Sequence, residues 1–418
     1  MTAFQNRKLW VVSELYRPED TSTGYFLTTI AEGVADRFDV NILCGRPTYA
    51  WRGQAVPRRE HVAKTHIRRL WSTAFRKDNI LGRTINLISF TVSVFIHACL
   101  RFRKGDLVLV VTNPPTVPPV VLVAGRLRGC RLLLLIHDVY PDVLFVTGAV
   151  RDHGFVGSTL RRFFNAFTRR FDHIIVLGRD MSAIIQQKLN AAEPPITIIP
   201  NWGDANIGTL GATEANRYRQ DLGLEGQCVF QFSGNIGRTH DVEAILDAMA
   251  ALADDAAITA LFIGDGGKAT LVRGAAGENI RYLPRQHKDR LGEMLKASDA
   301  TIIAFRPGMA GISVPSRMYN VMAAGVPIIA LADTESELAR VVDETGCGWV
   351  CNHRENLASL MRTIAANPED RRRRGELGRQ ALLANYTFDQ ILPQWKRVLD
   401  SLSSLPASAQ SANDPLQN

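Results

Sequence analysis

The sequence predicts an α/β protein with two doubly wound, Rossmann-like domains that face each other across a cleft. Short apolar runs alternate with helical patterns along the first half of the chain, and the same alternation repeats in the second half. Such alternation is typical of parallel βαβ units with helices on both faces of a sheet. The 418 residues, 46% hydrophobic and 22% charged, suffice for two or three folded domains and exclude a mainly disordered or coiled-coil chain.

The predicted elements follow one another in a similar order in both halves. In the first half we expect a helix at 25–38 and buried strands at 9–13, 40–44, 107–111, 132–136, 173–177 and 197–199. In the second half we expect a helix at 242–252 and strands at 228–232, 259–263, 280–283, 300–304 and 327–331. We therefore place the first domain at 1–200, a hinge at 201–225 and the second domain at 226–385. The polar tail 403–418 is expected to be disordered.

Charge is divided unevenly between the two halves. Residues 1–200 hold 27 Lys and Arg against 15 Asp and Glu, whereas residues 201–418 hold 22 against 26. A basic half indicates an anionic partner such as nucleic acid, an anionic membrane or a phosphorylated ligand. Aromatic residues, Trp51 among them, accompany the basic stretch 46–83. Because no RNA-recognition, KH or zinc-finger pattern is present, we expect no nucleic-acid partner.

The six Cys lack the paired spacing of a disulfide framework or a zinc site. Cys347 and Cys351 lie four residues apart, but no second pair or His cluster completes a metal site. The chain begins with polar residues, and its first apolar run, at 9–13, is too short for a signal peptide. We therefore expect reduced, structural cysteines and a cytoplasmic location.

Two segments suggest contact with a membrane. Residues 84–100 form an apolar run flanked by arginines, which fits a helix of the domain core, a helix in the membrane interface or a membrane span. Residues 160–171 interleave arginines with phenylalanines. That pattern suits an anionic lipid surface or a partly buried helix with a solvated basic face, and the sequence leaves these alternatives open.

Four loops that follow predicted strands carry the residues best suited to chemistry. Residues 18–24 end in a glycine at a helix start, where backbone N–H groups can approach an anion. Residues 137–142 place an imidazole and two carboxyl groups at the carboxyl end of a strand, where ligands bind in open α/β sheets. Taken alone, each loop also fits an ordinary connection or a helix cap.

The other two loops belong to the second domain. Residues 233–241 bring two glycines, Arg238 and His240 to a helix start, which suits a diphosphate. Residues 311–320 contain serines able to cap a helix, and Arg317 in its first turn. A cation there opposes the helix dipole, so a nearby anionic ligand would explain it.

These loops, in this order, resemble the retaining nucleotide-sugar glycosyltransferases of glycosyltransferase family 4, which have the two-domain GT-B fold. The similarity is greatest to the bacterial subgroup that builds colanic acid, capsule and O-antigen repeat units, and it spans about residues 8–400. The segments that carry it are 18–24, 47–49, 138–142, 199–202, 233–238, 264–266, 313–317 and 322–327. Each segment alone is weak evidence for the family, but the order of all of them along the chain is specific to it.

The resemblance implies a role for each matching residue. His137 and Asp138 would be the catalytic residues beside the reacting sugar. The donor diphosphate would be bound by Gly24, Asn235, Arg238, His240, Ser316 and Arg317. The donor sugar and ribose would be bound by Gly311, Ser313 and Asn320, and the nucleobase by the segment that contains Arg285. The final helix, 386–402, would cross back onto the first domain.

Two departures from the family pattern stand out. Family 4 commonly carries two Glu eight residues apart, and Ile312 and Asn320 occupy those positions here. Because both carboxylates are absent, recognition of the sugar must differ, although Asn320 could still hydrogen-bond a ribose hydroxyl. His240 stands where a Lys is usual, so one fixed positive charge is missing.

The mechanism implied by the resemblance needs no metal and no other cofactor. Protein dipoles and cations would stabilise the leaving diphosphate, and domain closure would exclude water while the bond forms with retention. The implied partners are a nucleotide-sugar donor, a lipid-linked (undecaprenyl diphosphate) saccharide acceptor and the anionic inner face of the plasma membrane. A UDP-sugar is the expected donor, with GDP-mannose or GDP-fucose as alternatives. Two other functions stay open: a nucleotide-sugar 2-epimerase and a non-catalytic nucleotide-binding protein.

Overall fold

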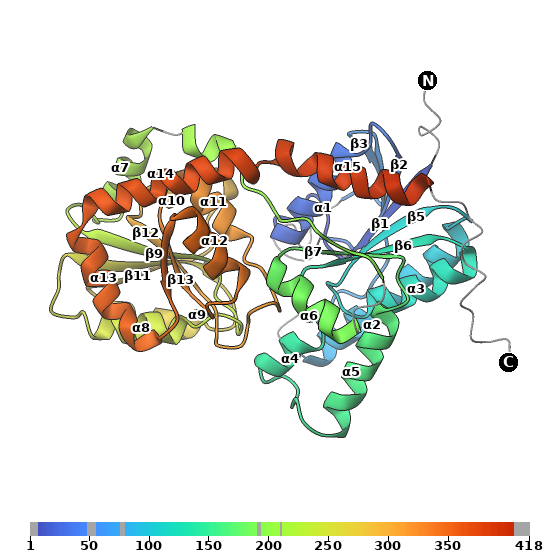
Figure 1. Ribbon diagram of the computed structural model, residues 1–418, viewed down its shortest axis with the longest axis horizontal. Helices are drawn as coiled ribbons and strands as arrows, with labels where there is room; N and C mark the ends of the chain where they lie inside the picture. The colour runs from blue at the N-terminus through green and yellow to red at the C-terminus, as the bar shows by residue number, and fades with distance from the viewer. Residues whose placement is uncertain (1–6, 48–55, 76–79, 190–193, 210, 405–418) are drawn as a thin grey trace.

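The computed structural model describes residues 7–47, 56–75, 80–189, 194–209 and 211–404, and Figure 1 shows them as two α/β lobes side by side. Thr48 and Tyr49 of the family-like segment, Trp51 and residues 405–418 of the expected tail lie outside the described residues. Two mainly parallel sheets, one in each lobe, confirm the predicted fold class.

The first domain is built on an eight-stranded sheet in the order β3-β4-β2-β1-β5-β6-β7-β8. Neighbouring strands are parallel except for β3, which is antiparallel to β4. The central strands are buried on both faces, as their continuous apolar sequences require. The strands are β1 Lys8–Ser13, β2 Asp39–Cys44, β3 Arg59–Val62, β4 Thr65–Arg69, β5 Leu107–Val111, β6 Arg131–Ile136, β7 His173–Val176 and β8 Ile196–Ile198.

Helices cover both faces of this sheet. The helix predicted at 25–38 begins earlier, at Ser22, because the hydroxyl of Thr21 accepts a hydrogen bond from the Gly24 N–H and caps it. It ends at Gly33. The helices of this domain are α1 Ser22–Gly33, α2 Ile80–Arg101, α3 Val117–Arg128, α4 Asp142–Val146, α5 Phe155–Thr168 and α6 Arg179–Leu189.

The second domain contains a six-stranded parallel sheet in the order β11-β10-β9-β12-β13-β14. Its strands are β9 Cys228–Asn235, β10 Ile258–Asp265, β11 Ile280–Leu283, β12 Ala300–Ala304, β13 Ile328–Leu331 and β14 Gly348–Cys351. Its helices are α8 Val242–Ala250, α9 Ala269–Gly274, α10 Leu291–Lys296, α11 Arg317–Ala324, α12 Glu337–Thr345, α13 Leu357–Ala366 and α14 Pro368–Asn385. In the predicted hinge segment, α7 Ala212–Asp221 packs on the second domain, where Tyr218 joins a buried cluster with Val229 and Leu261.

The last helix, α15 Phe388–Ser404, returns to the first domain, and Figure 1 shows α14 on the second lobe followed by α15 on the first. Lys396 Nζ lies 2.7 Å from Asp36 Oδ2, and Arg131 donates to the Leu402 carbonyl at 2.7 Å. Trp395 is buried in the core of the first domain. The end of the described chain is therefore part of the first domain's packing.

The apolar run at 84–100 lies in α2, which packs with one face only. Phe90, Val94 and Ala98 are buried against the sheet. By length and composition the segment Leu81–Arg101 could cross a membrane, and 22% of its most apolar window is buried. The helix is thus not a fully buried core helix. Six of its apolar side chains form an exposed stripe: Leu81, Ile85, Ile88, Val92, Ile96 and Leu100.

The segment of arginines and phenylalanines at 160–171 overlaps α5. Phe164, Phe167 and Phe171 are buried, whereas Phe163 is half exposed. Arg161 pairs with Asp152. Most of the aromatic surface therefore serves packing, which favours a partly buried helix with a solvated basic face.

Candidate active site

Both sheets reverse their strand order at one point, and these points define the site. The reversal falls between β1 and β5 in the first domain and between β9 and β12 in the second. Ligands of doubly wound sheets bind beyond the carboxyl ends of the strands at such a reversal. The two sets of loops meet, since Val139 N donates to Ile312 O at 2.9 Å and Asp138 forms a β-bridge with Ser313.

Glycines allow the end of β9 and the loop after it to pack closely on the end of β10. Gly264 has φ +146, and a Cβ there would lie 1.9 Å from the Gly234 carbonyl oxygen. Gly266 has φ +149, and a Cβ would lie 2.6 Å from Asn235 Oδ1. Only glycine fits both the backbone conformation and the space. Asn235 at the end of β9 and Arg238 on the loop that follows are both exposed.

Arg317 lies in the first turn of α11 and reaches back to the loop after β9. Its Nη1 donates to the Ser233 carbonyl at 2.8 Å, and its Nη2 donates to His240 Nε2 at 2.6 Å. The guanidinium stacks over Phe232, 4.9 Å from the ring centroid. Burial lowers the pKa of Arg317 to about 10, so it stays charged at neutral pH. A fixed cation therefore stands at the reversal point of the second sheet.

His240 is the hydrogen-bond partner of Arg317 Nη2. The ring is 6% exposed and stacks on Phe305, with centroids 5.5 Å apart. Burial, and then the charges of Arg317 and Lys268, lower its pKa well below the ordinary value. The neutral imidazole is therefore a hydrogen-bond acceptor, and no second cation stands at its position. Lys268 lies nearby, with Nζ 2.7 Å from the His240 carbonyl and 2.7 Å from Glu243.

The loop before α11 uses its predicted residues for contacts within the chain. Gly311 donates its N–H to Asp180 Oδ2 at 2.8 Å, and the Ser313 hydroxyl bonds to the carboxyl of Asp138. Ser316 occupies the N-cap position of α11 but makes no capping hydrogen bond with its side chain. The hydroxyl of Ser316 is therefore not used as a cap, and its role toward a diphosphate stays a prediction. Asn320 Oδ1 accepts from the Asp204 N–H at 3.1 Å, in the segment between the domains.

The first domain contributes His137 and Asp138 directly after β6. His137 Nδ1 lies 3.3 Å from Thr23 Oγ1, whereas its Nε2 is buried and has no hydrogen-bond partner among the described residues. Burial lowers the pKa of His137 to about 4, so the ring is neutral. Burial also raises the pKa of Asp138, and the hydrogen bond from Ser313 opposes that rise.

Two further predicted residues are already paired in this structure. The Gly24 N–H donates to the Thr21 hydroxyl at 3.2 Å, inside the first turn of α1. Arg285 forms an ion pair with Asp20 of the first domain at 3.3 Å and donates to the Asp20 carbonyl. Arg285 thus links the second domain to the loop after β1.

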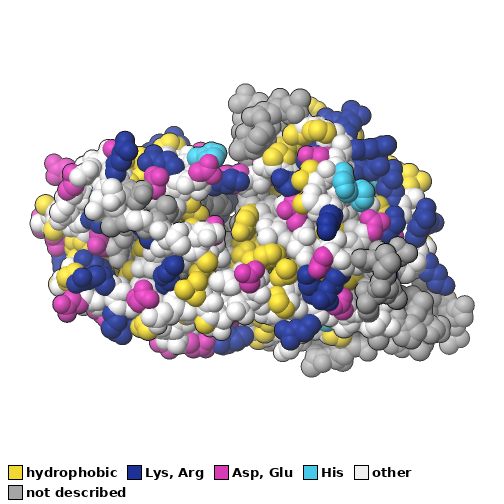
Figure 2. All heavy atoms as spheres, turned by 90° about the horizontal axis from the view of Figure 1, so that it is seen from above, with side chains coloured by type: hydrophobic (Ala, Val, Ile, Leu, Met, Phe, Trp, Pro, Cys, Tyr) yellow, Lys and Arg dark blue, Asp and Glu magenta, His cyan; other side chains and the backbone are white. Residues whose placement is uncertain are grey.

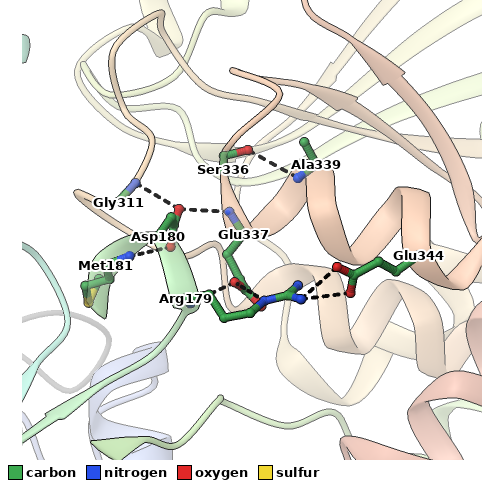
Figure 3. Close-up of polar contacts among 8 residues, drawn as sticks. All are labelled: Arg179, Asp180, Met181, Gly311, Ser336, Glu337, Ala339 and Glu344. Atoms are coloured by element: carbon green, nitrogen blue, oxygen red, sulfur yellow. Dashed lines mark hydrogen bonds and ion pairs between the residues drawn. The ribbon is translucent and has the colours of Figure 1, made fainter. Parts of the chain in front are cut away.

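A polar cluster between the domains was missed by sequence reasoning (Figure 3). Asp180 Oδ2 accepts from the N–H groups of Gly311 and Glu337, each at 2.8 Å, and its Oδ1 accepts from the Met181 N–H. Arg179 bonds to the carboxylates of Glu337 and Glu344 from the start of α6. The only sequence signal was an acidic residue in the first turn of a helix, which usually indicates a local cap.

Within the described ranges, no group of three or more His, Cys, Asp or Glu side chains could hold a metal ion. The expectation that the reaction needs no metal stays a prediction.

Two facing doubly wound domains, with the candidate site between the carboxyl edges of their sheets, define the GT-B class of glycosyltransferases. The family comparison is more specific. Residues 23–202 match the glycosyl transferase 4-like domain, and residues 214–381 match the glycosyl transferases group 1 domain. The chain belongs to the family 4 glycosyltransferases of the GT-B class, as the sequence predicted.

Relatives and a solved structure agree with this assignment. The glycosyltransferase WbjE of Pseudomonas aeruginosa is 32% identical over 316 residues, which cover 74% of this chain and 78% of WbjE. WcaI of Escherichia coli K12, a glycosyl transferase assigned to colanic acid biosynthesis, is 26% identical over 85% of this chain and 91% of its own length. Anabaena HepE in complex with UDP-glucose shares the fold, with a TM-score of 0.70 at 15% identity over 94% of this chain and 99% of that one. The chain is therefore a glycosyltransferase of polysaccharide biosynthesis.

Proposed function

We propose that the protein moves a sugar, with retention, from a UDP-sugar to a lipid-linked (undecaprenyl diphosphate) saccharide. The observation that carries the proposal is Arg317, a charged and largely enclosed guanidinium at the reversal point of the second sheet. A cation fixed by Ser233, His240 and Phe232 costs little reorganisation when charge develops on a leaving diphosphate. The UDP-glucose complex of the HepE fold relative supports the choice of nucleotide.

In this proposal the first domain supplies the groups next to the sugar. The buried Nε2 of neutral His137 would hydrogen-bond a sugar hydroxyl, because a buried polar nitrogen gains most from a partner. The carboxyl of Asp138, which touches Ser313 of the second domain, would lie beside the acceptor and the breaking bond. Arg238, exposed on the loop after β9, would reach the outer phosphate. No metal enters these steps.

The first test is a thermal-shift screen of the purified protein with UDP, GDP, dTDP and CMP, without and then with Mg²⁺. A ligand well above its dissociation constant stabilises the native state by mass action. We expect UDP alone to raise the melting temperature by a few degrees, with no dependence on Mg²⁺. A shift with none of the four nucleotides would contradict the donor site, and a shift with GDP would replace UDP as donor.

Turnover separates the transferase from the two other functions. Donor hydrolysis or transfer that is lost in Asp138→Asn and reduced in Arg238→Ala would support the proposal. Isomerised nucleotide-sugar formed without any acceptor would instead identify an epimerase. Nucleotide binding without turnover over a broad panel of donors and acceptors would identify a non-catalytic protein.

We also propose that the first domain lies on the anionic inner face of the plasma membrane, in the cytoplasm. The exposed apolar stripe of α2 supports this, because such a surface on a soluble domain usually marks an interaction site. Arg103 and Lys104, just beyond the helix, would meet lipid phosphates. Ile88→Glu should reduce the fraction of protein that co-sediments with vesicles containing phosphatidylglycerol. Leu383→Glu, at an exposed apolar position of the second domain, should leave that fraction unchanged.

A further inference from the structure

A second basic region lies on the first domain, apart from the donor site. The hairpin β3–β4 forms one edge of the sheet and, with the end of α2, encloses a groove of about 360 Å³. The register places Arg59 opposite Arg68, and His61 opposite His66, so these four side chains share one face of the hairpin. Arg101, the last residue of α2, completes the wall. We name this the arginine groove.

The three guanidinium groups of the arginine groove lack carboxylate partners. Within the described part of the chain, Arg59, Arg68 and Arg101 form no ion pair, and the buried Nε of Arg101 has no hydrogen-bond partner. Burial, and then the charges of Arg101 and Arg59, lower the pKa of Arg68. Like charges directly opposite each other in a hairpin are destabilising. The sequence thus retains a cluster that costs stability on its own.

The opposite face of the same strand shows how the chain neutralises an arginine. Arg69 pairs with Glu60 at 2.8 Å and donates to the carbonyls of Pro57 and Arg17 at 2.9 Å. Glu60 also lines the arginine groove, but its Oε2 is engaged by Arg69 rather than by Arg59, Arg68 or Arg101. A second acid near the groove, Asp39, lies 3.5 Å from Lys8 and 3.7 Å from His66. The groove keeps a positive charge.

We propose that the arginine groove binds a phosphoryl group. Guanidinium forks match phosphate oxygens in a bidentate manner, and convergent arginines are the usual device for phosphate recognition. An anion among Arg59, Arg68 and Arg101 would relieve their mutual repulsion. None of these residues belongs to the donor site, so this binding goes beyond the proposed transfer reaction.

The source of the phosphoryl group is either a lipid headgroup or a soluble phosphate. The apolar stripe of α2 ends at Leu100, immediately before Arg101. A lipid lying along α2 could thus place its phosphate at the groove. Figure 2 shows Lys and Arg side chains around a histidine patch on the lobe that carries β3, so a soluble anion could also reach this surface.

The test compares Arg59→Gln/Arg68→Gln with a matched control, Arg58→Gln/Lys64→Gln. Both double variants remove two positive charges from the same hairpin, but Arg58 and Lys64 do not line the groove. We expect the groove variant to bind inorganic pyrophosphate at least about tenfold more weakly by calorimetry, since each bidentate contact is strong. The control should bind like the unaltered protein. Equal weakening in both variants, or no pyrophosphate binding by the unaltered protein, would overturn the proposal.

Two further readouts separate folding from binding and identify the source. Without ligand, the groove variant should melt no lower than the unaltered protein, because it loses only repulsion. UDP should raise the melting temperature of both variants equally. A missing UDP shift would therefore contradict the proposed donor site without bearing on the arginine groove. Weaker binding of the groove variant to phosphatidylglycerol vesicles, with phosphatidylcholine vesicles as reference, would indicate a lipid headgroup. Unchanged vesicle binding with weaker pyrophosphate binding would indicate a soluble phosphate.

Discussion

The two sides of the cleft prepare their charged groups in opposite ways. On the second domain, both Nη atoms of Arg317 are hydrogen-bonded, one to the Ser233 carbonyl and the other to the neutral ring of His240. On the first domain, His137 keeps a buried ring nitrogen without a partner among the described residues, and Asp138 has a raised pKa. The difference teaches that the second domain already holds its cation by hydrogen bonds, whereas the first domain keeps a buried polar group that a ligand could satisfy.

The largest effect should come from removing the rigid cation. Arg317→Ala should lower kcat/KM for transfer by about 10²–10³-fold, the usual cost of losing one fixed group that stabilises developing charge. Arg317→Lys keeps the positive charge but loses the forked guanidinium, so its kcat/KM should lie between those of the unaltered protein and Arg317→Ala. Steady-state kinetics with UDP-sugar measures this. Equal kcat/KM in all three proteins would refute the contrast between the domains.

The next largest effect concerns the cluster that holds the two sides together. Asp180→Ala leaves the N–H groups of Gly311 and Glu337 without their acceptor, and should cost about 3 kcal/mol of unfolding free energy. Glu344→Gln is the control, since its ion pair with Arg179 is exposed and should be worth less than about 1 kcal/mol. Urea denaturation would measure both. A larger loss in the control would show that α6 and α12 are held by Arg179 instead.

A pH titration of stability should sharpen the contrast. The pKa of His137 is about 4 when folded and near 6.5 when unfolded, so between these values the unfolded state binds the extra proton. The unfolding free energy should therefore fall as pH drops from 6.5 toward 4, by about 1.4 kcal/mol per pH unit for this group. His137→Gln should remove that part of the slope. An identical slope in the variant would place the titration elsewhere, with His173 and His240 as further buried imidazoles whose pKa burial lowers.

The smallest effect should come from Ser313→Ala. The Ser313 hydroxyl holds down the pKa of Asp138 against the effect of burial. Its removal should raise that pKa and move the acidic limb of the pH–rate profile upward by less than about one pH unit. Rates at neutral pH should change little. A profile that moves downward, or a large loss at neutral pH, would assign Ser313 to the donor rather than to Asp138.

The central strands and the loops after them could be predicted because buried parallel strands have continuous apolar sequences. The strands Leu107–Val111, Ile280–Leu283 and Ala300–Ala304 have the predicted limits. The hairpin β3–β4 was missed because its residues are charged on one face and it lies at a sheet edge. In Thr65–Arg69 buried and more exposed positions alternate, but the last buried position holds Arg69, so the sequence does not show an alternation of apolar and polar residues.

Site residues were harder to interpret than strands because pairing across domains leaves no local pattern. The sequence singled out His240 for its position, but not its role as a neutral acceptor for Arg317, which depends on Phe305 and Lys268. Asp180 and Glu337 are 157 residues apart, and nothing in either segment indicates the other. The approach of Arg285 to Asp20 is equally non-local. The contacts of His240 follow from the tertiary packing of the second domain, and those of Asp180 and Arg285 follow from how the domains dock, which no periodicity encodes.

The return of α15 has a consequence for synthesis on the ribosome. Domains usually fold as units, the N-terminal one first. Here the hydrophobic core of the first domain is completed only by Trp395 and its neighbours in α15, which emerge after the whole second domain. Until then the nascent first domain exposes the surface that α15 later covers. Folding of the two lobes is thus linked in time, and a chain stalled before residue 388 would present that apolar surface to chaperones.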